Sequence, residues 1–338
     1  MAKTFEQSLL LQPDPGLPGT FTNVHPPWTW PSSTVVPGGT LMALSAAAAR
    51  TTLLSSLISS PPTASASGSS NVNSVVGVAL NNLQIHFLAG PNAAKPISLT
   101  VNRVSSSRRF HVLTVDVRQH GRPMCLVTCT FMTAAAGPWK GRAMKHAAPR
   151  AVGSPQVSRI AVEHDDLSLG RSSGGQHSGP FMAFQRLPLM VDGDDKPSPE
   201  HTIAPIACHI TPAITSDDPF IHVLGVLSLS DYHVLDFPPA AHGIPFGLAP
   251  IGQPVSNTTL SQVKFFTSLN HTIHFERNDG FRADEIMYVQ VTSPWASNGR
   301  AVMNTKIFTG QENLVATCVQ EAYYILQDDA QSGAGSKL

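Results

Sequence analysis

Hydrophobic and polar residues alternate along several runs of the chain. The segment "LVATCVQEAYYI", from Leu314 to Ile325, is one of them, and alternation with a period of two predicts a β-strand. One side of this strand would carry Leu314, Ala316, Cys318, Gln320, Ala322 and Tyr324. Gln320 is the polar exception in this mostly apolar row, so its presence requires an explanation.

Two blocks of the sequence each contain four strand-like runs separated by turn residues. The runs of the first block cover residues 83–90, 96–105, 109–123 and 124–132. Those of the second cover residues 271–278, 285–293, 299–313 and 314–322. His120-Gly121 and Thr309-Gly310 stand where hairpin turns should lie.

The two blocks repeat at a constant distance. Ile85 and Ile273 each begin an Ile-His-Phe triplet and are 188 residues apart. Leu126 and Leu314 each begin a Leu-Val pair and are separated by the same 188 residues. The identical offset at both ends of the block predicts one structural unit that is used twice.

A helix candidate precedes each block. In "PGGTLMALSAAAART", Thr40 is the expected N-cap of an Ala-rich helix. In "SDDPFIHVLGVLSLSDYHVL", Asp218 is the expected N-cap and Pro219 the first helical residue. Apolar residues surround this second helix on nearly all sides, which predicts burial against a sheet. The pattern therefore predicts an α+β fold of duplicated helix-plus-sheet units.

Composition and charge narrow the classes of function. Lys+Arg and Asp+Glu both number 22 in 338 residues, and no basic stripe indicates a nucleic-acid partner. No run of eighteen apolar residues predicts a membrane span. The four cysteines form no CxxC pair, so we expect buried, reduced thiols. The 14 histidines show no metal-binding spacing, and we expect no metal site.

Polar stretches divide the chain. The Ser-rich segment Ser55–Ser74 and the segment 191–201 read as surface loops, and residues 134–179 read as a connection between two halves. We predict an N-terminal unit at 1–138, a linker at 139–180, a C-terminal unit with the active site at 181–330 and a flexible tail at 331–338.

The last three residues are Ser336, Lys337 and Leu338. A terminal Ser-Lys-Leu triplet is an address that a peroxisomal import receptor reads. We therefore expect this receptor as a partner and a peroxisomal location, which favours acyl-CoA chemistry. An accidental ending is the alternative.

The chain resembles the acyl-CoA thioesterases of type II, including peroxisomal members. The resemblance covers roughly residues 5–138 and 180–326, through "VPGGT", "LQIHFLAG" and "RRFHVLTVDVRQHGRP" in the first half. In the second half it includes "LSLSDYHVL", "TSLNHTIHFER" and "NLVATCVQEA". It implies a double hotdog fold, in which each of two fused antiparallel sheets wraps around a helix.

The resemblance also implies a catalytic set. The family holds a nucleophilic water with an Asp, a Thr or Ser, and a Gln, which fall here on Asp231, Ser268 and Gln320. The substrate would be an acyl-CoA thioester, with coenzyme A as the leaving thiol and without a cofactor. This set would explain the polar exception in the row of Gln320.

Each of these residues can be read chemically. Asp231 follows an apolar helix, where burial and the helix dipole disfavour its charge, which suits a general base near neutral pH. Gln320 would orient water or stabilise an oxyanion. The structural alternatives are a solvated Asp231, a core Gln320 bonded to backbone, and a Ser268 on a wet face with Asn270 and His274.

Three histidines lie near these segments. His233, His271 and His274 could each act as a proton shuttle or contact the substrate. A hydrogen-bonded structural histidine is the alternative for each of them.

The duplication predicts a single site of this type. At the same offset, Gln320 corresponds to Met132 and Ser268 to Leu80, which are both apolar. The first half would therefore lack the polar set.

Departures from the family leave other functions open. Asn270 replaces a common Asp, and His274 and Glu276 replace an aromatic and a basic or His residue. A hotdog enzyme of specialised, polyketide-type biosynthesis that dehydrates, isomerises or cyclises an acyl intermediate is one alternative. A non-catalytic thioester-binding protein is another. The sequence leaves the acyl chain and the oligomeric state open, although homo-oligomers are common among such sheets.

Overall fold

The computed structural model describes residues 4–29, 33–59, 77–133, 146–147, 149, 151, 181–191, 198–246 and 261–327. The elements of the first half are α1 (Phe5–Ser8), β1 (Leu11–Pro13), β2 (Thr20–Asn23), α2 (Gly38–Ser59), β3 (Val78–Phe87), β4 (Ser98–Ser106), β5 (Phe110–Gln119) and β6 (Arg122–Thr133). Those of the second half are β7 (Met182–Arg186), β8 (Met190–Val191), η3 (Pro199–His201), β9 (Thr202–Ile210), α4 (Phe220–Leu229), α5 (Phe237–Ala241), β10 (Val263–Phe275), β11 (Met287–Ser297), β12 (Arg300–Thr309) and β13 (Leu314–Leu326).

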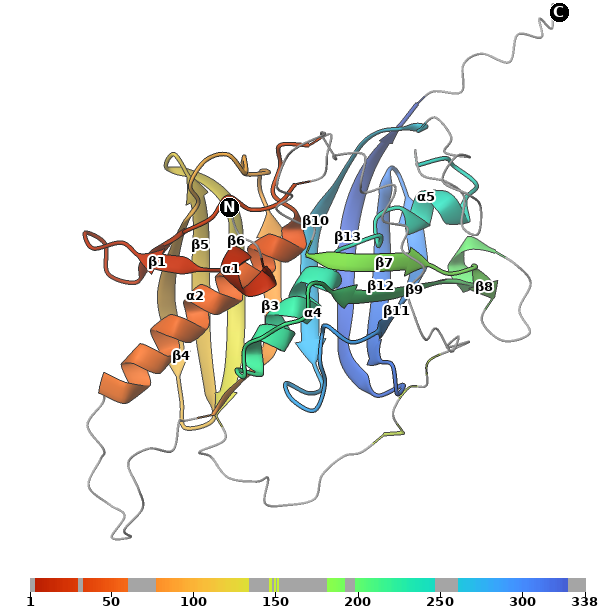
Figure 1. Cartoon of the computed structure of the whole chain (residues 1–338). Helices are drawn as coiled ribbons and strands as arrows, with labels where there is room; N and C mark the ends of the chain where they lie inside the picture. Colours follow the sequence, from red (N-terminus) through yellow and green to blue (C-terminus); the bar gives the residue numbers. More distant parts are fainter. Residues whose placement is uncertain are drawn as a thin grey trace, which may run out of the picture.

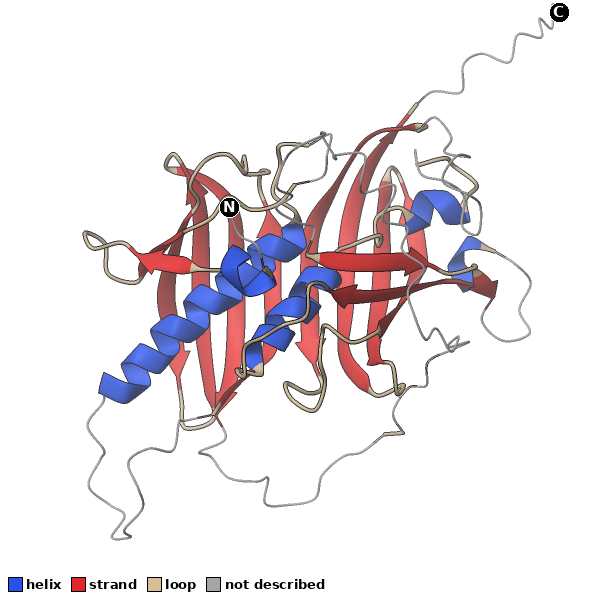
Figure 2. Ribbon diagram, in the orientation of Figure 1, coloured by secondary structure: helices blue, strands red, loops and turns tan. Residues whose placement is uncertain are grey.

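The strands form one curved sheet of thirteen strands whose described neighbours all pair antiparallel (Figure 2). The order is β1-β2-β4-β5-β6-β3-β10-β13-β12-β11-β9-β7, and β8 pairs with β9. Figure 1 shows the long helix α2 and the shorter helix α4 side by side in front of the sheet. Both halves of the chain therefore contribute one main helix to the same face.

Two hairpins are closed by two-residue turns. His120 and Gly121 link β5 to β6 with φ angles of 51° and 76°, which are the positive values that a type I′ turn requires. Asn298 and Gly299 link β11 to β12 in the same way, with φ angles of 52° and 72°. The predicted turn at Gly310 also lies between two strands, but its loop is longer, because β13 begins at Leu314.

Both main helices begin at slightly different residues from those predicted. α2 starts at Gly38, so Thr40 lies inside the helix and is not its N-cap. Pro219, not Asp218, occupies the N-cap position of α4. The Asp218 carboxylate still accepts a hydrogen bond from the Phe220 backbone N–H at 3.0 Å, so it caps the first turn from one residue further back.

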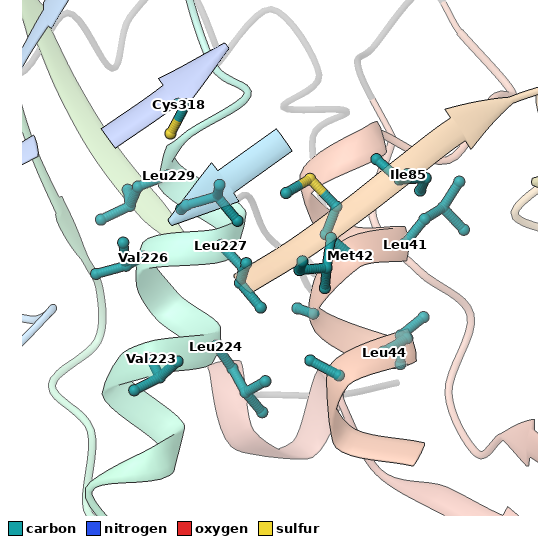
Figure 3. Close-up of a cluster of buried hydrophobic side chains, with 14 of the residues drawn as sticks. Leu41, Met42, Leu44, Ile85, Val223, Leu224, Val226, Leu227, Leu229 and Cys318 are labelled. Atoms are coloured by element: carbon teal, nitrogen blue, oxygen red, sulfur yellow. The ribbon is translucent and has the colours of Figure 1, made fainter. Parts of the chain in front are cut away.

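The hydrophobic core lies between the two helices and the sheet (Figure 3). Leu41 and Met42 on α2 and Leu227 on α4 are at most 2% exposed, and they meet side chains from the strands such as Ile85. Among the described residues, α2 is long and apolar enough to cross a membrane by length and composition alone. A buried core helix meets the same two criteria, and α2 packs against α4 and four strands.

The pairing of β3 with β10 joins the two halves and is symmetric about their offset. Gln84 pairs with Thr272, and these two residues are 188 positions apart. On either side of this pair, Leu83 pairs with Ile273 and Ile85 pairs with His271. Exchanging each residue for its mate in the other half returns the same set of pairs. A local two-fold axis therefore passes through the Gln84–Thr272 pair, as expected for a duplicated unit.

Candidate active site

Gln320 points from β13 toward the helices. Alternation continues along this strand, where Ala316, Cys318, Gln320 and Ala322 are buried and Val319 is exposed. The predicted inward face of the strand is therefore confirmed, and Gln320 is only 1% exposed.

Ser268 reaches the same face because β10 contains a β-bulge. Ser268 pairs with Ala322, but Asn270 pairs with Glu321, so Leu269 is an extra residue on β10. The prediction that Ser268 shares a face with Asn270 and His274 is therefore wrong. After the bulge the inward residues are His271 and Ile273, which are both 0% exposed, whereas His274 is exposed.

Asp231 lies between the end of one helix and the beginning of the other. It follows α4 by two residues, and its Oδ2 accepts a hydrogen bond from the Gly39 backbone N–H in the first turn of α2 at 2.9 Å. The N-terminus of α2 carries a partial positive charge, which favours a carboxylate there. The approach is close: a Cβ on Gly38 would lie 2.8 Å from Asp231 Oδ2 and 2.7 Å from the ring of Phe87.

The three side chains that the resemblance implied meet in one hydrogen-bonded group. Gln320 Nε2 donates to Asp231 Oδ1 at 2.8 Å and to Ser268 Oγ at 2.7 Å. The carboxylate can only accept, so the amide nitrogen, not the amide oxygen, must face it. Both N–H groups of Gln320 are then in use. Its Oε1 is buried and has no hydrogen-bond partner in the protein.

His271 completes the inward surface of the site. Its Nε2 lies 3.4 Å from Ser230 Oγ, and its Nδ1 lies 3.9 Å from Asp231 Oδ1, which is longer than a hydrogen bond. Nδ1 is buried and has no hydrogen-bond partner. This histidine therefore stands directly behind the carboxylate.

The other two histidine candidates lie elsewhere. His233 has Nδ1 3.3 Å from Asp236 Oδ2 and packs edge-on against Phe184. His274 is on the outer face, with Nδ1 3.4 Å from Asn82 Nδ2. The described contacts join neither of them to Asp231.

Burial and the carboxylate of Asp231 control the neighbouring acidic groups. Burial, and secondarily the charge of Asp231, raise the pKa of the Cys318 thiol and the pKa of the Tyr232 hydroxyl. Cys318 therefore stays a protonated thiol and is unsuited to act as a nucleophile. All four cysteines are free and buried, as predicted.

The first half carries apolar residues at the corresponding positions. The bulge recurs between Leu80 and Asn82, 188 residues before the bulge after Ser268, so Leu80 corresponds to Ser268. His271 pairs with Gln320, whereas its mate Leu83 pairs with Cys129. Gln320 thus corresponds to the fully buried Cys129. The predicted equivalence with Met132 is wrong, because Met132 is 37% exposed on the outer face.

The residues that depart from the family pattern face away from the site. Asn270 Nδ2 donates to Glu321 Oε2 at 3.2 Å, and Glu321 also accepts from Arg300 at 3.1 Å. His274 and Glu276 are exposed. These departures, which motivated the alternative of dehydration, isomerisation or cyclisation, therefore do not line the site.

Other features lie apart from this group. A cavity of about 720 Å³ at the opposite end of α4 has Pro219, His222 and Arg282 in its lining, but none of the predicted site residues. Within the described ranges, no three His, Cys, Asp or Glu side chains form a cluster that could hold a metal ion. Ser336, Lys337 and Leu338 lie outside the described residues.

Sequence reasoning missed the contribution of α2. The Gly39 N–H holds Asp231, yet the sequence offers only the pair Gly38-Gly39 as a signal. Two adjacent glycines at a helix start often mark a close backbone approach.

Comparison with protein families matches both halves of the chain. Residues 26–132 match the model "Acyl-CoA thioesterase N-terminal domain", and residues 143–324 match "Acyl-CoA thioesterase C-terminal domain". Acyl-coenzyme A thioesterase 8 of Homo sapiens is 23% identical over 254 residues, which are 72% of this chain and 72% of that protein.

Solved structures share the fold. The acyl-CoA thioesterase II TesB2 of Mycobacterium marinum matches with a TM-score of 0.64 and 20% identity, over 98% of this chain and 100% of that chain. A tesB protein of Mycobacterium avium subspecies paratuberculosis matches with a TM-score of 0.63 and 15% identity, over 95% and 98% of the two chains. These matches confirm the double hotdog fold. The chain belongs to the acyl-CoA thioesterase family and is a thioester hydrolase that acts on acyl-CoA.

Proposed function

We propose that Asp231, Ser268 and Gln320 hold one water molecule and direct it at the thioester carbonyl of an acyl-CoA. The water would donate one hydrogen bond to the Asp231 carboxylate and the other to Gln320 Oε1. Ser268 accepts from Gln320, so its own hydroxyl hydrogen is left to donate to the water. One lone pair of the water then remains for attack.

The reaction then needs no covalent intermediate with the protein. As the water oxygen bonds to the carbonyl carbon, Asp231 takes the proton as general base. The tetrahedral intermediate collapses with cleavage of the carbon–sulfur bond. The products are the free acid and coenzyme A, whose thiolate takes up a proton.

One observation supports this proposal above the others. Gln320 Oε1 is a buried acceptor without a protein partner, in a residue whose two N–H groups are both committed. A buried polar atom without a partner is costly, and a bound water would satisfy it. The same arrangement argues against Gln320 as an oxyanion donor, a role considered for it from the sequence.

The test is release of free thiol from acyl-CoA by Asp231→Asn and Gln320→Ala. We expect kcat to fall by about 10²–10⁴-fold in Asp231→Asn, because the general base is lost. Gln320→Ala should lower kcat as well, because the water loses an acceptor and Asp231 loses a donor. Mass analysis of the wild-type products should show the free acid.

Gln119→Ala is the matched control. Gln119 is also a buried glutamine, but its amide bonds to the backbone of Asn92 and Lys95. Its replacement should lower stability and leave kcat per folded molecule unchanged. Wild-type kcat in both site variants would refute the mechanism, and a product of unchanged mass would refute hydrolysis.

We also propose a peroxisomal location, which the triplet Ser336, Lys337 and Leu338 supports. A fluorescent protein fused to the N-terminus of the chain should enter peroxisomes through the import receptor. Removal of Leu338 alone should leave the fusion in the cytosol. A fusion that stays cytosolic with the triplet intact would refute the proposal.

A further inference from the structure

An aromatic pair, Phe246 and Phe266, lies next to the proposed water site. Phe266 precedes Ser268 by two residues on β10, and the register between them is regular: Phe266 pairs with Tyr324 and Ser268 with Ala322. Side chains two positions apart on a strand point to the same side of the sheet. The Phe266 ring therefore projects from the face that carries Ser268, Gln320 and the helices.

This end of the inward face is open. Phe266 is 44% exposed, whereas His271 and Ile273 further along the same row are 0% exposed. The ring of Phe246 covers part of Phe266, with centroids 4.7 Å apart and an angle of 56° between the rings. Phe246 itself is only partly buried. Past the proposed water site, the row thus changes from closed core to an accessible aromatic surface.

The segment that carries Asp231 leads to the same place. Tyr324, the strand partner of Phe266, donates from its hydroxyl to the Leu235 carbonyl at 2.9 Å. This bond holds the chain between Asp231 and Phe246 over the end of β13. The general base and the aromatic pair are therefore fixed to the same two strands.

The distance from the site suits the substrate. Two residues along a strand span about 6.6 Å, which roughly five or six carbon atoms of an extended acyl chain would cover. Aromatic rings offer such a chain a large apolar contact area and no charge. The phosphates and the adenine of coenzyme A would instead require donors or cations.

We propose that Phe246 and Phe266 hold the acyl part of the substrate. The substrates are then acyl thioesters whose apolar acyl group extends at least about six carbons from the carbonyl. This inference builds on the proposed function, because it takes Ser268 and Gln320 as the position of the thioester.

Binding tests the inference without turnover. The probes are two coenzyme A thioethers, S-octyl-CoA and S-methyl-CoA, titrated into the full chain by calorimetry. Wild-type protein should bind the octyl compound more tightly. Phe266→Ala should reduce this preference by about tenfold, because the chain loses an aromatic wall. Phe246→Ala should do the same and serves as the second variant.

Phe265→Ala is the matched control. Phe265 is a neighbouring phenylalanine on the same strand, 48% exposed, and alternation directs it to the outer face. Its replacement should leave the preference for the octyl compound unchanged. A preference that stays at the wild-type value in both Phe266→Ala and Phe246→Ala would overturn the inference, and so would an equal loss for both thioethers.

Hydrolysis assays keep the two proposals apart. If wild-type protein shows the octyl preference and Phe266→Ala loses it, the inference stands even where no thiol is released, and the water mechanism alone fails. If Asp231→Asn abolishes hydrolysis but Phe266→Ala treats acetyl-CoA and octanoyl-CoA as wild type does, the mechanism stands and the inference fails.

Discussion

Gln320 and Asp231 form the closest polar contact of the site, so the charge of one controls what the other can be. The amide donates to the carboxylate at 2.8 Å. A carboxylate in place of the amide would bring two acceptors together, and like charges at this distance cannot both ionise.

Gln320→Glu therefore converts the site into a coupled acid pair. One carboxyl should keep its proton well above the usual pKa of roughly 4. The folded state then holds a proton that the unfolded state releases, so the free energy of unfolding falls relative to wild type as the pH rises above roughly 4. Thermal unfolding at a series of pH values checks this. A difference in Tm that does not change with pH would contradict the coupling.

The sequence identified the residue types of the site but placed only part of them. Alternation predicted the inward face of Gln320, because β13 is regular there. It failed for Ser268, because the bulge at Leu269 shifts the phase and no glycine or proline marks it. It failed again for Met132, because the second half has three more residues between its paired positions.

At the scale of elements, the contact between α2 and α4 positions the general base. A Cβ on Gly39 would lie 2.5 Å from the Ser228 carbonyl oxygen and 3.1 Å from that of Leu227. Only glycine allows the start of α2 to approach the end of α4 so closely. The same approach brings the Gly39 N–H to Asp231.

Gly39→Ala should force the two helices apart. We expect the free energy of unfolding to fall by about 1–3 kcal/mol, as for other overpacked cores. The activity should fall as well, because Asp231 loses its backbone donor. Denaturant unfolding and thiol release measure the two effects.

Gly16→Ala serves as the comparison for this change. A Cβ at Gly16 would meet only Asp14 Oδ1, at 3.4 Å, and both properties should stay near wild type. Wild-type stability and activity in Gly39→Ala would show that the helix contact is not needed.

Strong periodicity predicted eight of the strands, whereas the short or buried ones were missed. The eight predicted runs correspond to β3–β6 and β10–β13. β9 was missed because it is buried on both faces, so its residues do not alternate. β1 and β8 have only three and two residues, too few to show a period.

For the whole molecule, the central pair β3 and β10 makes one sheet out of two halves. The sequence predicted the duplication but not this pairing, because the partner of an edge strand is decided by docking and not by local pattern. Each half would expose an unpaired central strand without the other.

The two halves should therefore unfold together. Native-state hydrogen exchange at increasing denaturant should show the amides of β6 and β13 losing protection at the same concentration. Loss of protection in one half well before the other would contradict this coupling.

The two-fold axis through Gln84 and Thr272 describes what a pair of identical chains would have if each contributed one unit. In such a pair every substitution appears twice, so a position could not be polar on one side and apolar on the other. Joining the units in a single polypeptide removes that restriction. One copy can keep Gln320 for chemistry while the other uses Cys129 to fill space.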